Sequence, residues 1–285
     1  MKSVQERLEF STENEATSDY VVDVLRRYGI SIVRRFAYGQ MLHELRDEYD
    51  RIFSEEDDGI FAKHEHPANE GGKVARLNRL NLGRASFPTC HKVFESKFME
   101  DIARVYFAPY GYVLNDEIFA TYEVQSHQPI LPWHYDRQQS LKFYIYLSET
   151  TRINGAFEYV PGSHREGRYR ANYHLIRGIR HQDLPNDIPE DEIINPVTID
   201  GSAGDLIIFD ADGFHRGGVV QEGKERMVIR GHSHPLPKLP QRRSRLVRWI
   251  VQSRSKVADL LRDKVERQVG ERIRSGEKRR GCAKS

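Results

Sequence analysis

The chain has 285 residues, of which 38% are hydrophobic and 30% are charged, and its formal net charge is +2. This composition excludes a fibrous or wholly disordered protein, and the length suits one sandwich or barrel domain with extensions. The two cysteines, Cys90 and Cys282, exclude a disulfide framework and a CxxC zinc site. With no long apolar stretch and no apolar signal region, the sequence predicts a cytoplasmic location.

Helices are predicted in the N-terminal part of the chain. Apolar residues recur at helical spacing over residues 18–28, 40–53 and 91–107. Gly29 separates the first helix from a β-rich run, which predicts a strand from Ile30 onward. After the second helix, an acidic, glycine-bearing stretch predicts that residues 54–74 include a mobile loop.

From residue 115 onward, short runs rich in β-branched or aromatic residues are separated by Gly, Pro, Asn or Asp, as is typical of strands. These runs are EIFATYEV, LKFYIYL, AFEYV, NPVTI, DLIIF and RMVIRGH. The order predicts an α+β fold with a mainly β core, in which the N-terminal helices pack on one face of a double sheet. The long insert at residues 165–195 is predicted to form a lid or rim.

The C-terminal segment differs in charge from the rest of the chain. Residues 241–285 hold 15 Lys and Arg against 5 Asp and Glu. Apolar residues recur there at near-helical spacing, which predicts a basic amphipathic helical tail. We therefore expect a domain over residues 1–240 and a tail over 241–285 that contacts another subunit or an acidic surface.

The chemistry is predicted to lie at PWHYD and at a histidine some eighty residues later. On an extended segment, residues i and i+2 point to the same face, so His134 and Asp136 can bind one ion. His215, after the strand DLIIF, can supply the third ligand. Two histidines and one carboxylate on one side of a metal are typical of non-haem iron(II) oxygenases. Arg226, eleven residues further on, can pair with the far carboxylate of a bound dicarboxylic acid.

The runs PWHYD, RINGAFEYVPGSHREG, GSAGDLIIFDADGFHRGG and ERMVIRGH resemble the phytanoyl-CoA dioxygenase family of iron(II)- and 2-oxoglutarate-dependent oxygenases. The resemblance is close over residues 115–235 and loose in the helical N-terminal part. It implies a double-stranded β-helix, or jelly roll, with His134, Asp136 and His215 as the catalytic iron ligands. It also implies that Arg226 holds the 5-carboxylate of 2-oxoglutarate.

The implied reaction consumes dioxygen, decarboxylates 2-oxoglutarate to succinate and hydroxylates a small-molecule metabolite; desaturation or cyclisation are other outcomes. Because Asp136 is present, halogenation is not expected. Both histidines must be neutral to bind metal, so activity should fall below about pH 6.

Other residues are predicted to line the pocket. Tyr144 is a candidate for the co-substrate pocket, and Trp133 and Tyr135 are candidate walls for the substrate. The residues His64, His66, Arg76 and Arg79, the last two expected on a helix, are candidates for contact with an anionic substrate.

Two features depart from a simple metal motif. Gly217 stands where the family often has a hydroxyl residue that assists the arginine. His232 and His234 are two residues apart, but no carboxylate lies beside them in the sequence, so they are interpreted as strand-end or pocket residues.

Two alternatives remain open at this point. The first is a cupin-type metal enzyme that does not use 2-oxoglutarate, which would have no need for Arg226. The second is a binding module that acts through the basic tail on nucleic acid or anionic lipid, and its binding would weaken steeply with salt.

Overall fold

The computed structural model describes residues 8–11, 17–67 and 69–236. The predicted basic tail at residues 241–285 and Cys282 lie outside the described residues. None of the helices within those ranges is long and apolar enough to cross a membrane.

Two facing sheets form the core, and all but one of their strand pairs are antiparallel. The larger sheet has the spatial order β1 (Glu9–Ser11), β2 (Ile30–Arg34), β9 (Leu206–Asp210), β6 (Leu141–Tyr146), β11 (Arg226–Pro235), β5 (Tyr112–Glu123), β4 (Lys73–Asn78) and β3 (Ile60–Glu65). The smaller sheet has the order β10 (His215–Gly217), β7 (Phe157–Tyr159) and β8 (Val197–Ile199). Among the strands of the described residues, only β1 and β2 pair in parallel. The predicted jelly-roll core is confirmed.

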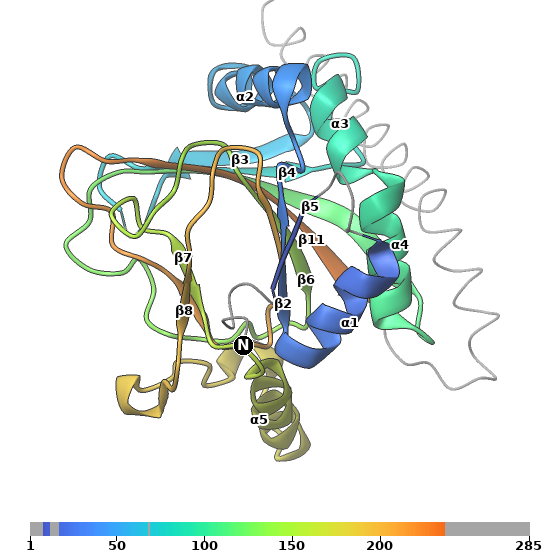
Figure 1. Ribbon diagram of the computed structural model, residues 1–285, viewed down its shortest axis with the longest axis vertical. Helices are drawn as coiled ribbons and strands as arrows, with labels where there is room; N and C mark the ends of the chain where they lie inside the picture. The colour runs from blue at the N-terminus through green and yellow to red at the C-terminus, as the bar shows by residue number, and fades with distance from the viewer. Residues whose placement is uncertain (1–7, 12–16, 68, 237–285) are drawn as a thin grey trace, which may run out of the picture. The chain divides into compact units, whose positions relative to one another are not determined.

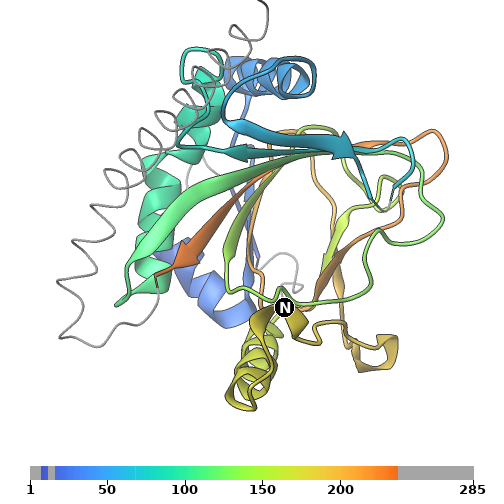
Figure 2. The ribbon, with the colours of Figure 1, turned by 180° about the vertical axis from the view of Figure 1, so that it is seen from behind.

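Helices cover the outer face of the larger sheet, as predicted. In the N-terminal part they are α1 (Ser18–Tyr28), α2 (Gly39–Ser54), α3 (Pro88–Phe94) and α4 (Lys97–Phe107). Figures 1 and 2 show α1, α3 and α4 on the side of the large sheet away from β7 and β8, with α2 beyond β3 and β4. The side chain of Thr17 accepts a hydrogen bond at the start of α1, and Gly29 ends that helix in the left-handed conformation at φ 78°.

Two predictions about the N-terminal part are wrong. Residues 91–107 form parts of two helices, because the chain leaves helical geometry at Glu95 and adopts an extended backbone at Ser96. Residues 54–74 are not simply a loop, since all of β3 and the start of β4 lie within them and these strands form a hairpin. β4 pairs with β5, which satisfies the hydrogen-bonding groups of its backbone. Local sequence patterns do not reveal such long-range pairing. Arg76 consequently lies on a strand and Arg79 in the turn that follows it, and neither lies on a helix as expected.

The predicted lid at residues 165–195 includes most of α5 (His164–Ile176) and two short 3-10 turns, η2 (His181–Asp183) and η3 (Glu190–Glu192). A separate cluster of buried side chains lies near this insert, apart from the main core. Its members are Trp133, Tyr135, Val160, Ile188 and Phe214. This cluster and the main core together fix the segments that carry the candidate site.

Candidate metal centre

The structure brings together the three residues that the sequence predicts as metal ligands. His134 Nε2 and His215 Nε2 lie 3.8 Å and 3.6 Å from Asp136 Oδ1. All three donor atoms lie within 4.8 Å of one another. A metal ion bound at about 2.0–2.2 Å from each atom requires separations of this order. Two imidazoles and one carboxylate facing one point therefore fit a divalent iron ion.

The backbone around His134 explains the convergence. His134 and His215 are joined by two hydrogen bonds between their own backbones, N to O 3.1 Å and 2.8 Å, so their rings lie side by side. Asp136 is fixed on the same extended segment by a 2.7 Å bond from its N–H to Ala211 O. Trp133 and Tyr135, the two neighbours of His134 in the chain, belong to the separate buried cluster. The prediction that these two aromatic residues form the substrate wall is wrong, because alternation on the extended chain turns them away.

Both ligand histidines are oriented in the same way by their own chain. His134 Nδ1 lies 2.9 Å from Pro132 O, and His215 Nδ1 lies 2.7 Å from Gly213 O. A carbonyl oxygen can only accept, so each Nδ1 carries the proton and each Nε2 keeps its lone pair. This is the arrangement of a ligand histidine supported by an outer hydrogen bond.

Lys142 is a component of the centre that the sequence analysis missed. Its Nζ lies 2.6 Å from Asp136 Oδ2, the carboxylate oxygen that does not face the histidines. Burial alone would raise the pKa of Asp136, but Lys142 and the histidines outweigh this effect and hold that pKa well below its usual range. The ion pair keeps Asp136 ionised and directs its other oxygen toward the metal position.

The segment that precedes His215 is fixed by buried polar contacts. The hydroxyl of Ser163 donates to Val160 O at 2.7 Å and accepts from Phe214 N at 2.8 Å. Arg168 of α5 pairs with Asp212 at 2.7 Å and also with Asp210. The PGSH run therefore positions the strand of the third ligand, and His164 within it starts a helix rather than binding the metal centre.

Arg226 lines the same cavity as His134 and His215, with only 2% of its surface exposed. Its guanidinium pairs with the carboxylate of Glu123, which is also buried, and donates to the carbonyl oxygen of Gly155. A Cβ at Gly217 would lie 2.7 Å from Arg226 Nη2. The guanidinium thus fills the space that a side chain at position 217 would need, which explains the absence of a hydroxyl residue there. Gly155 of the Asn154-Gly155 pair supports the arginine through its backbone.

A cavity of about 380 Å³ connects these groups. It is lined by His134, His215, Lys142, Tyr144, Arg226 and Arg230, together with apolar side chains including Val74, Phe119, Ile130, Leu131, Phe157 and Phe209. Tyr144 lies in this wall, where the sequence analysis expects it, and burial raises the pKa of its phenol. The cavity therefore brings cationic and apolar side chains together with the two ligand histidines.

The remaining predicted pocket residues have different outcomes. His64, His66 and Arg76 line the cavity from β3, β4 and the turn between them. Arg79 does not line it, because its guanidinium binds Glu95 and the backbone oxygens of Leu114 and Asn115.

A second group of two histidines and a carboxylate forms across β5 and β11, where Glu117 lies opposite His232 and near His234. The sequence analysis did not expect a carboxylate there. Glu117 already pairs with Arg76, and burial together with Lys142 and Arg230 holds the pKa of His232 well below its usual value. These neighbouring cations oppose a divalent ion at this position.

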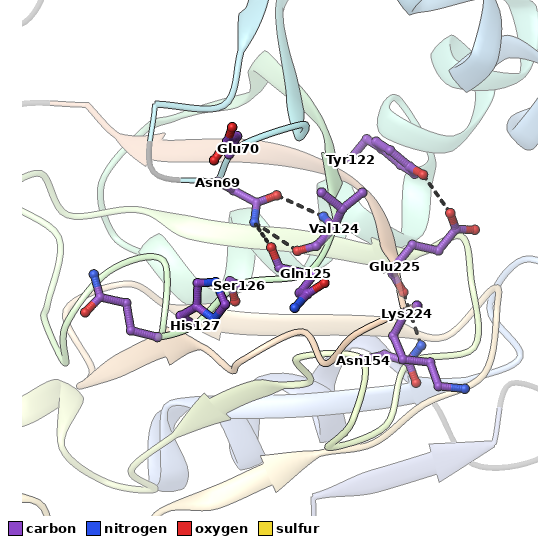
Figure 3. Close-up of a pocket in the computed structure, with 12 residues that line it drawn as sticks. Asn69, Glu70, Tyr122, Val124, Gln125, Ser126, His127, Asn154, Lys224 and Glu225 are labelled. Atoms are coloured by element: carbon purple, nitrogen blue, oxygen red, sulfur yellow. Dashed lines mark hydrogen bonds between the residues drawn. The ribbon is translucent and has the colours of Figure 1, made fainter.

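A second cavity, of about 900 Å³, is lined mainly by polar groups (Figure 3). The amide of Asn69 borders it and exchanges 2.9 Å hydrogen bonds with the backbone N–H and C=O of Val124. Tyr122 donates to Glu225 at 2.7 Å on the same wall. This cavity includes none of the triad residues, nor Tyr144 or Arg226, so the smaller cavity is the candidate active site.

Metal binding is expected to weaken as the pH falls, with a midpoint below 6.5. Burial lowers the pKa of His134, and burial with the neighbouring His134 ring lowers that of His215 much further. A lowered pKa keeps the imidazole neutral, so binding is complete above that pKa and is lost as the pH falls through it. Titrating Ni(II) into the protein by calorimetry from about pH 8 to about pH 5 measures the midpoint. A midpoint at or above 7 would contradict the assignment of these ligands.

Comparison with known proteins decides the family. The sequence model of the family "Phytanoyl-CoA dioxygenase (PhyH)" matches residues 25–228, which are well over half of the chain. The chain belongs to the phytanoyl-CoA dioxygenase family. The matched range includes the triad, Glu123 and Arg226. Iron(II), 2-oxoglutarate and dioxygen are the cofactor and co-substrates of this family, and the triad offers the donors that iron requires. No sequence among curated proteins matches the chain.

Solved structures similar to this family member share its fold. The α-ketoglutarate-dependent carbocyclase SnoK from nogalamycin biosynthesis is 16% identical, with a TM-score of 0.57 over 83% of this chain and 91% of that one. The epimerase SnoN, solved with Fe3+, α-ketoglutarate and nogalamycin RO, is 14% identical, with a TM-score of 0.55 over 76% and 83%. HygX from Streptomyces hygroscopicus, solved with nickel and 2-oxoglutarate, is 14% identical, with a TM-score of 0.50 over 77% and 88%.

Proposed function

We propose that this protein is an iron(II)- and 2-oxoglutarate-dependent dioxygenase that hydroxylates a small-molecule metabolite and converts 2-oxoglutarate to succinate. The observation that carries the proposal is the convergence of His134, Asp136 and His215 beside a cavity that is lined by both histidines and by Arg226. His134, Asp136 and His215 would hold the iron, and Arg226 would bind the far carboxylate of 2-oxoglutarate. Family membership supports both assignments.

In this proposal, the bound iron supplies the activation of dioxygen. The protein's residues hold the reactants in position and limit their contact with water. His134 and His215 present neutral Nε2 atoms, and Lys142 keeps Asp136 ionised. Arg226 has donors beyond those used by Glu123 and Gly155, since a guanidinium carries five N–H groups. These remaining donors would receive the carboxylate.

The outcome of the reaction is part of the proposal. The titles of the similar structures name an epimerase and a carbocyclase, so the fold is compatible with results other than hydroxylation. Hydroxylation is proposed because no second function is favoured by a residue of this cavity. A cupin-type enzyme without 2-oxoglutarate would leave the buried Arg226 without a role in the cavity.

The anaerobic complex of iron(II) with 2-oxoglutarate gives a weak visible absorption band, which tests the proposal directly. We expect the band in the wild type, its loss in His134→Ala, and a weakened co-substrate affinity in Arg226→Lys, because lysine cannot form a bidentate pair. Arg152→Lys, at an exposed position away from the cavity, is the matched control and should behave as the wild type. A wild type without the band at saturating iron and 2-oxoglutarate would refute the proposal.

Two further assignments belong to the same proposal. A cytoplasmic location is supported by the presence of only two cysteines, of which Cys90 is buried and unpaired. The basic segment at residues 241–285 is proposed as a separate tail that contacts another subunit or an acidic surface, on the basis of its charge alone.

A further inference from the structure

The cationic side chains of the active-site cavity differ in whether they have a carboxylate partner. Lys142 pairs with Asp136, Arg226 with Glu123, and Arg76 with Glu117. Arg230 lines the same cavity, but no carboxylate lies within ion-pair distance of it among the residues that the structure describes. The wall therefore contains three neutralised cations and one whose charge is not matched.

Arg230 is held in a fixed orientation by two aromatic rings. Its Cζ lies 4.9 Å from the centroid of Phe119 and 5.8 Å from that of Tyr144. The side chain is partly buried, and its Nε is buried without a hydrogen-bond partner in the described structure. A partly buried guanidinium without a counterion costs free energy, whereas an anion delivered to the cavity would supply the missing partner. Contact with the two rings limits the movement of the guanidinium and so favours binding of that anion.

The co-substrate does not account for Arg230. Arg226 and Arg230 are four residues apart on β11, which places their α-carbons about 13 Å from each other along the strand. Arg226 lies beside Gly217, whereas Arg230 lies between Phe119 and Tyr144. With one carboxylate of 2-oxoglutarate at the metal and the other at Arg226, both of its charges are used. The positive charge of Arg230 remains for a different molecule.

We propose that Arg230 binds a carboxylate of the organic substrate, so that the substrate is a carboxylic acid with an apolar or aromatic body. This inference rests on the proposed function, because it assigns 2-oxoglutarate to Arg226. One unmatched positive charge balances one negative charge, which suits a carboxylate better than a phosphate monoester with its charge of about −1.5 to −2.

The apolar part of the cavity supports the rest of that description. Val74, Ile130 and Leu131 lie in the lining, and Phe157 contributes to the wall near His215. An acid whose carboxylate reaches Arg230 would place its apolar body against these side chains. Arg76, whose Cζ lies 5.1 Å from the centroid of Phe119, adds a second cation, although Glu117 already neutralises it. Arg230 is therefore the residue to test.

The experiment measures binding of two simple acids and their amides to protein saturated with Ni(II) and 2-oxoglutarate. The probes are 2-naphthoate and octanoate, with 2-naphthamide and octanamide as uncharged counterparts. Binding of each probe is measured by calorimetry. We expect the wild type to prefer at least one acid over its amide. Arg230→Gln should weaken binding of that acid by about 10- to 100-fold and leave amide binding unchanged. Arg230→Lys should give a smaller loss, and the exposed-site control Arg152→Gln should give none.

The outcomes distinguish this inference from the proposed function. Binding of Ni(II) and 2-oxoglutarate is measured first, and its absence in the wild type would count against the proposed function and therefore against this inference. With that binding intact, a wild type without preference for either acid over its amide overturns the assignment of Arg230. The assignment is also overturned if Arg230→Gln weakens the binding of 2-oxoglutarate and leaves the binding of the acid unchanged. Thermal melting of Arg230→Gln and Arg230→Lys identifies any loss of acid binding that results from unfolding. If Arg230→Gln is unfolded, acid binding by Arg230→Lys decides whether the assignment of Arg230 stands.

Discussion

Replacing Arg226 with methionine is expected to lower the free energy of unfolding by about 3–5 kcal/mol, because it leaves the Glu123 carboxylate buried without its partner. Arg226→Met should also abolish 2-oxoglutarate binding, since methionine offers no donor to a carboxylate. Urea denaturation measures the first effect, and calorimetry with 2-oxoglutarate on Ni(II)-loaded protein measures the second.

The double variant Arg226→Met, Glu123→Leu separates stability from binding. Removing both charges leaves apolar groups of similar size, so most of the lost stability should return. Binding of 2-oxoglutarate should stay absent, because it requires the guanidinium. If Arg226→Met unfolds at the same urea concentration as the wild type, the buried pair does not contribute as its geometry indicates. If the double variant binds 2-oxoglutarate, Arg226 is not the carboxylate receptor.

Replacing Asp136 with alanine is expected to have the largest effect on the metal. Asp136 is the only anionic member of the triad and also the partner of Lys142, so its loss removes a ligand and leaves a cation beside the metal position. The dissociation constant for Ni(II) should rise by more than the factor of about 10–100 that the loss of an outer-shell partner causes. Turnover of 2-oxoglutarate should fall to the background without enzyme.

Lys142→Met is the matched comparison at the same ion pair. It removes the group that orients Asp136, which weakens metal binding, but it also removes a repelling positive charge, which strengthens it. Its effect on the Ni(II) dissociation constant should therefore be smaller than that of Asp136→Ala. An equal or larger effect would show that Lys142, rather than the carboxylate, dominates the affinity.

The triad could be predicted because two of its residues are close in the sequence and the third lies at a spacing typical of the family. The two-residue periodicity of an extended chain places His134 and Asp136 on one face without any knowledge of the fold. The strand DLIIF precedes His215. The spacing of eleven residues from His215 to Arg226 matches the one that the family resemblance implies. Most helices and strands could also be predicted, since apolar residues recur at helical spacing in α1 and α2 and form a short, nearly continuous run at β6.

The groups that surround the triad could not be predicted, because they depend on strand register. Glu123 meets Arg226 because β5 and β11 pair directly opposite each other at these positions. Glu117 meets His232 through the same register. The sequence contained one usable signal, the single lysine within the otherwise apolar strand LKFYIYL, since lysine is rarely buried without a partner. The β3–β4 hairpin was missed because its pairing with β5 is likewise long-range.

Each ligand histidine is anchored by a carbonyl oxygen only two positions earlier in its own chain, at Pro132 for His134 and at Gly213 for His215. The hydrogen bond that orients each imidazole therefore comes from the backbone and not from a side chain of the cavity wall. Substitutions at wall positions such as Phe119, Leu131 or Arg230 can change which molecule fits without turning the ligands away from the metal. Divergence of substrate choice around an unchanged metal centre is thus open to this scaffold by single amino-acid replacements.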